Sequence, residues 1–189
     1  MTARRAPIAV AALAFAFGLT ACTNEVGGQA TASSSPAGTT APATNSTTAD
    51  PGNPFAGLSP CTIVDQALAG LGFPKAEPTV ADAKESCRAS KPSSVSTQGA
   101  DVAVSLQPGL GYRDNVGNPS QASEGNVNGR PAVEEREPLN VTGQCGVWLE
   151  VKPSSRALVL VASGSDTTAA CKLVEEVSPK VESQLPKNN

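Results

Sequence analysis

Four cysteines form the most reactive set of side chains in this 189-residue sequence: Cys61, Cys87, Cys145 and Cys171. An even number of cysteines is typical of disulfide bonds in an exported protein, because the extracytoplasmic compartment lacks the systems that keep thiols reduced. Three pairings are open, and we favour Cys61 with Cys171, near the starts of two predicted helices, and Cys87 with Cys145, in predicted strands. The first bridge would close a loop of roughly 110 residues and stabilise the fold by about 4–5 kcal/mol through chain entropy.

Other cysteine chemistry is less favoured. The sequence contains no Cys-x-x-Cys pair, which argues against thiol redox catalysis. The four cysteines are also widely spaced, whereas structural zinc sites draw their ligands from closely spaced pairs. We therefore expect no metal and no cofactor.

The absence of histidine limits the catalytic options further. With no histidine in the chain, Ser-His-Asp and Cys-His mechanisms are excluded. Carboxylates remain, and Asp114, Glu134 and Glu135 define the alternative function, a carboxylate-dependent hydrolase or transferase. The run Glu134-Glu135-Arg136-Glu137 is explained more simply as the charged residues of a solvated strand edge, where charges also discourage aggregation. We assign no catalytic residue and expect a non-enzymatic protein.

The first 21 residues have the pattern of an export signal. Arg4 and Arg5 precede the apolar run 6–18, which is too short to favour a membrane-spanning helix. Leu-Thr-Ala-Cys, ending at Cys22, resembles the bacterial lipobox, whose cysteine is lipidated and becomes the mature N-terminus. The alternative is an ordinary signal peptide with a chance cysteine. We expect lipidation of Cys22 and attachment to the outer face of the cell membrane.

Residues 22–53 predict a tether. They are almost all Ser, Thr, Ala, Gly, Pro, Asn or Gln, a composition that cannot bury enough apolar area to fold. The net charge of the whole chain is −3, and no basic cluster follows the signal, which disfavours nucleic acid as a partner. We expect residues 54–189 to form one monomeric domain, held at the membrane by the lipid.

Apolar periodicity and caps indicate the elements of that domain. A helix is predicted over 59–70, because Ser59 suits the N-cap, Pro60 the first turn and Gly70 the end. A second helix is predicted from Asp166 or Thr167 to Leu185 by an apolar residue every three or four positions. Strands are predicted over 84–90, 101–107, 128–137, 145–152 and 156–162. This order predicts an α+β fold with an antiparallel sheet and both helices on one face.

Two regions are candidates for ligand binding. The connection of about 20 residues after Pro108 is unusually long for a compact domain. It contains Tyr112 and Arg113, residue types that are frequent in binding hot spots. Trp148 alternates onto the sheet face opposite Val147 and Leu149. If that face is open, Trp148 is a ligand contact; if the long loop covers it, Trp148 is part of a second core, which we favour.

The folded part resembles a family of actinobacterial lipoproteins whose domain has no assigned function. The resemblance rests on Ser59-Pro60-Cys61, the segment Gly129-Arg130-Pro131-Ala132, the strand opened by Cys145, and Cys171 in the C-terminal helix. It implies lipid anchoring and cysteine pairing, and it carries no catalytic residue. We expect a lipid-anchored envelope protein that binds a small ligand, a glycan or a protein partner.

Overall fold

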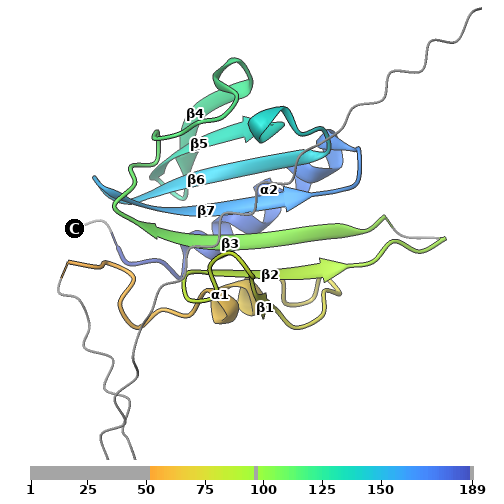
Figure 1. Cartoon of the computed structure of the whole chain (residues 1–189), viewed down its shortest axis with the longest axis horizontal. Coiled ribbons are helices and arrows are strands. Elements are labelled where there is room, and N and C mark those ends of the chain that lie inside the picture. The colour runs from red at the N-terminus through yellow and green to blue at the C-terminus, as the bar shows by residue number, and fades with distance from the viewer. Residues whose placement is uncertain (1–51, 96–97, 188–189) are drawn as a thin grey trace, which may run out of the picture. The chain divides into compact units, whose positions relative to one another are not determined.

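The computed structural model describes residues 52–95 and 98–187 (Figure 1). Cys22, the predicted signal and nearly all of the predicted tether lie outside the described residues. The elements are α1 (Pro60–Ala67), β1 (Glu77–Pro78), β2 (Ser86–Lys91), β3 (Ala100–Pro108), the 3-10 turn η1 (Pro119–Gln121), β4 (Ala122–Val127), β5 (Arg130–Arg136), η2 (Pro138–Asn140), β6 (Gln144–Lys152), β7 (Ser155–Ala162) and α2 (Thr167–Glu182). No helix within these ranges is long and apolar enough to cross a membrane.

The strands form one antiparallel sheet of seven strands in the order β1-β2-β3-β7-β6-β5-β4. Strands β4 to β7 follow one another as neighbours, and β7 then pairs with β3, which places β7 in the centre. Figure 1 shows α2 behind β6 and β7, α1 at the lower side of the sheet beside β1 and β2, and β4 at the upper edge. The predicted α+β class, the antiparallel sheet and the two helices are confirmed.

Both helices begin where their caps predict. The Ser59 side chain accepts a hydrogen bond from the Thr62 amide, and the Asp166 side chain accepts one from the Ala169 amide. Each cap satisfies an amide that would otherwise lack a partner at a helix start. The first helix ends at Ala67, earlier than predicted, and the second continues through Pro179 to Glu182.

The core lies between the helices and one face of the sheet. It consists almost entirely of Val, Leu, Ile and Ala together with Cys87, Cys145 and Cys171, and Phe55 is the one buried aromatic residue among those described in this core. Val159 and Val161 of β7 are completely buried on this face. Leu158 and Leu160, on the opposite face of β7, are only partly buried. β7 is therefore completely buried on one face only.

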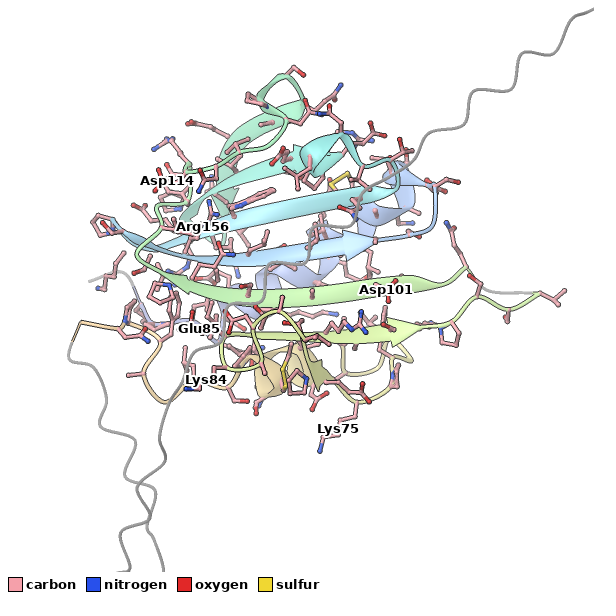
Figure 2. All side chains as sticks on the ribbon, viewed as in Figure 1. Lys75, Lys84, Glu85, Asp101, Asp114 and Arg156 are labelled. Carbon is pink, nitrogen blue, oxygen red and sulfur yellow. A yellow bond between two sulfur atoms is a disulfide. The ribbon has the colours of Figure 1, made fainter. Side chains whose placement is uncertain are left out.

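The predicted pairing of the cysteines is wrong. The disulfides join Cys61 to Cys87 and Cys145 to Cys171, with Cα atoms 4.9 and 5.0 Å apart. The reason is that α1 packs on β2 and β3 whereas α2 packs on β6 and β7, so the two helix starts lie over different halves of the sheet. Each bridge therefore joins a helix to the strand beneath it (Figure 2, yellow bonds).

Two strands were not predicted. β1 has only two residues, one of them Pro78, and β4 is a polar strand of which residues 123–126 are exposed. Neither has an alternating apolar pattern, because both form edges of the sheet. The long connection after Pro108 therefore contains η1 and β4 before the turn at Asn128 and Gly129.

Candidate functional site

The long loop covers the sheet face that lacks helices. Tyr112, Val133 and Trp148 form a second buried cluster, in which Tyr112 is 9% and Trp148 5% exposed. Trp148 is therefore second-face core, as favoured from the sequence. The open binding surface carrying Tyr112 and Trp148 is absent from the described part of the chain.

Arg113 is the exposed member of the predicted binding group. Its guanidinium lies 4.4 Å from the centre of the Tyr112 ring and forms two hydrogen bonds of 2.7 Å with the Glu124 carboxylate. The Arg113 hydrogen bond lowers the pKa of Glu124. Both side chains are exposed, so this ion pair contributes little stability, but it connects the loop to β4.

Two of the carboxylates that defined the enzyme alternative hold this loop in place. Asp114 accepts a 2.7 Å hydrogen bond from the Gly111 amide, and its backbone carbonyl accepts one from Arg156 (Figure 2). Glu135 is fully buried and accepts a hydrogen bond from the Asn118 amide. Burial lowers the pKa of Arg156, and the charge of Asp114 opposes that effect. Asp114 and Glu135 thus have structural contacts on one face of the sheet.

Glu134 lies on the other face, in a groove between β4 and α2. Because neighbouring residues of a strand point to opposite faces, Glu134 is separated from Glu135 by the sheet. The groove has a volume of about 350 Å³. Its lining consists of Ser123, Glu124, Gly125, Asn126, Val127, Asn128, Ala132, Glu134, Val147, Glu175, Ser178 and Pro179.

Three carboxylates line this β4–α2 groove; Glu124 is paired with Arg113, and Glu134 and Glu175 determine the electrostatics of the groove. Burial raises the pKa of Glu134, and the negative charge of Glu175 raises it further, while Arg136 lowers it. Among the described residues that line the groove, none is Lys or Arg. Glu134 could be proposed from the sequence but Glu175 could not, because no local pattern relates a strand residue to a helix residue about 40 positions away.

The raised pKa predicts how Glu134 affects stability. A carboxyl whose pKa is higher in the folded state stabilises the fold below its unfolded pKa, and this contribution is lost as pH rises through the folded pKa. Glu134→Gln keeps the neutral form at every pH, so its melting temperature should equal or exceed that of the wild type at about pH 7 and match it at about pH 4. Thermal unfolding at the two pH values tests this, with Glu175→Gln as the matched variant. A less stable Glu134→Gln at neutral pH would instead indicate a dominant ion pair with Arg136.

A group of potential metal ligands adjoins the groove. Glu134, Cys145 and Cys171 bring ligand atoms within 4.8 Å of one another. The two sulfur atoms are joined in a disulfide, however, so neither is available as a thiolate. This group does not form a metal site while the disulfide is intact.

The segment Gly129-Arg130-Pro131-Ala132 has a structural role. Arg130 is 5% exposed and forms an ion pair with Glu182 at 3.0 Å. It also donates hydrogen bonds to the carbonyls of Glu150 and Pro186. Arg130 thus holds the C-terminal end of α2 against the sheet beside the β4–α2 groove.

These features define a class of protein: a disulfide-bridged α+β domain with two helices on one face of an antiparallel sheet and a loop across the other. The chain belongs to the family described as Protein of unknown function (DUF3558), which matches residues 17–184 and so includes every described helix and strand. No curated protein and no solved structure matches the chain. The expected resemblance to a domain without an assigned function is thereby confirmed.

Proposed function

We propose that this protein is an exported lipoprotein, anchored through Cys22 at the outer face of the cell membrane, whose domain binds a ligand in the β4–α2 groove. The observation that carries the binding proposal is the groove itself, a concave surface lined by the apolar side chains of Ala132 and Val147 and by carboxylates that include Glu134 and Glu175. Binding sites commonly combine an apolar lining with a few polar groups that orient the ligand. The proposed activity is binding without catalysis.

Export is supported by the state of the cysteines. All four cysteines of the described domain are paired, and Cys87, Cys145 and Cys171 are fully or almost fully buried. Structural disulfides of this kind are typical of exported proteins and rare in the cytosol. The fifth cysteine, Cys22, is then left as the lipid attachment site that the signal pattern predicts.

Replacing Cys22 tests the anchor. In a bacterial host that lipidates proteins, the wild type should incorporate an alkyne-labelled palmitate and sediment with membranes. Cys22→Ala should lose the label and be released from the membrane, because the two or three acyl chains that provide stable attachment are then missing. Thr23→Ala is the matched control and should behave as the wild type. An unlabelled wild type would refute lipidation.

Site-specific photo-crosslinking tests the groove. Ser123, which lines the groove, is replaced by a photoreactive amino acid. Irradiation of the intact envelope should crosslink the protein to its ligand in one discrete adduct, which is identified by its mass. The same amino acid at Ser165, an exposed position away from the groove, serves as the control. Equal adducts at both positions, or none at Ser123, would contradict binding in the groove.

The enzyme alternative retains one specific observation in its favour. A carboxyl with a raised pKa beside a second carboxylate, as in Glu134 and Glu175, is a pattern used for general acid catalysis. Ser178, which also lines the groove, donates its hydroxyl to the Val174 carbonyl and so offers no free nucleophile there. Turnover of reporter glycosides that is abolished by Glu134→Gln would favour the hydrolase over the binding protein.

A further inference from the structure

We propose that the β4–α2 groove takes an extended peptide that pairs with β4 as an additional strand and places a lysine or arginine side chain between Glu134 and Glu175. This inference rests on the proposed function, because it names the ligand class of the same groove. Three features of the described residues carry it: the edge position of β4, the glycine in its centre and the charge of the groove.

The first feature is that β4 is an edge strand without the usual protection. The sheet order places β5 on one side of β4 and no described strand on the other. Proteins commonly blunt such edges with proline, lysine or very short strands, as β1 does with two residues and Pro78. β4 has six residues, none of them Pro or Lys, and the charge of Glu124 is paired with Arg113. Its outer backbone edge can therefore accept the main chain of an extended peptide.

The second feature is Gly125 in the middle of β4. It pairs with Ala132, and both line the groove, so two small residues stand opposite each other on the helix side of the sheet. Its φ is not among the positive values, and a Cβ added there would meet no atom within 4 Å. Neither backbone conformation nor crowding requires glycine at this position. The missing side chain leaves space beside β4 that a side chain of a paired peptide can enter.

The third feature is the charge that such a side chain would meet. Glu134 and Glu175 both line the groove. Burial, and then the charge of Glu175, raise the pKa of Glu134, and a cation bound between the two carboxylates would stabilise their charged forms. In addition, Pro179 has no amide proton, so the Glu175 carbonyl lacks its usual helical donor. Carboxylates and a carbonyl oxygen together match the donors of an ammonium or guanidinium group.

The same charges disfavour a second copy of this chain as the occupant. Pairing of β4 with β4 of another copy would bring two acidic grooves together, and the whole chain is itself acidic, with a net charge of −3. Like charges across an interface weaken it. A cationic peptide has the opposite relation to the groove and is favoured by it.

An array of capped seven-residue peptides tests the proposal. Each peptide has a central Lys, Arg, norleucine or Glu, with flanks varied among Ser, Thr, Val and Ile, and the probe is the mature chain carrying Cys22→Ala with both disulfides formed. Peptides with central Lys or Arg should bind about tenfold more tightly than their norleucine counterparts, because a charge-assisted hydrogen bond is lost in the latter. In a titration followed by NMR, the amides of 122–127 should shift.

Variants of the groove give matched controls. Glu134→Gln and Glu175→Gln should each weaken binding of the Lys peptide about tenfold while leaving the fold intact. Gly125→Ala should weaken it less than Gly125→Val, since the valine side chain fills more of the groove, and both should melt no lower than the wild type. Methylating the backbone amides of the peptide should abolish binding, because the added strand needs those donors.

The outcomes separate this inference from the proposed function. Equal binding of the norleucine and Lys peptides, or peptide binding that leaves the β4 amides unshifted, would overturn it. Concentration-dependent dimerisation with shifts in β4 would identify a second copy as the occupant and would also overturn it. If Ser123 crosslinks a ligand on the envelope but no cationic peptide of the array binds, the groove remains a binding site and only the peptide inference fails.

Discussion

Removing either disulfide is expected to lower the free energy of unfolding by about 3.5 kcal/mol, and full reduction is expected to unfold the domain at 37 °C. Each bridge closes a loop between cysteines 26 residues apart, and a loop of this size carries that chain-entropy contribution. Together the two contributions approach the total stability of a typical domain, which is about 5–15 kcal/mol. The small aliphatic core has little to offset this loss.

Denaturant unfolding of two double variants measures the effect. Cys145→Ala with Cys171→Ala frees the start of α2 from β6, and Cys61→Ala with Cys87→Ala frees α1 from β2. Mass spectrometry of unreduced peptides supplies the control, because it identifies the bridges directly. Recovery of Cys61 joined to Cys171, or a loss below about 1 kcal/mol for both pairs, would contradict the structure and its energetic interpretation.

The second large effect is expected at Trp148. Truncating it to alanine should cost about 3–5 kcal/mol, because the ring is 5% exposed and packs with Tyr112 and Val133. The ring also lies directly over Gly146, where an added Cβ would come within 2.7 Å of it. Trp148→Phe keeps most of the apolar contact and should cost much less.

Fluorescence tests the same point without a substitution. Trp148 is the only tryptophan of the chain, so the intrinsic emission reports this site alone. In the native protein the emission should be shifted to short wavelength and be resistant to acrylamide, and both properties should be lost on unfolding. Emission like that of a solvated indole in the native state would mean that the loop carrying Tyr112 leaves the sheet face open.

The regular elements were predictable because their signals are local. β3, β6 and β7 alternate or run apolar, and both helices begin at capping residues, so each could be predicted from neighbouring residues alone. β4 could not be predicted in this way, since its exposed polar residues are held by pairing with β5 and not by burial. The edge strand on which the proposed peptide site depends therefore could not be predicted from the alternation of apolar residues.

The candidate site shows the same division. The amino-acid sequence alone indicated the position of most elements, the even number of cysteines in the folded part and the presence of carboxylates without histidine. The pairing of the cysteines follows from the three-dimensional fold, because it depends on which half of the sheet each helix covers. The fold also separates Glu134 from Glu135, placing the first in a groove with Glu175 and the second beneath a loop. The physical reason is that adjacent residues of a strand point to opposite faces, and the environment of each face is made by segments distant in the chain.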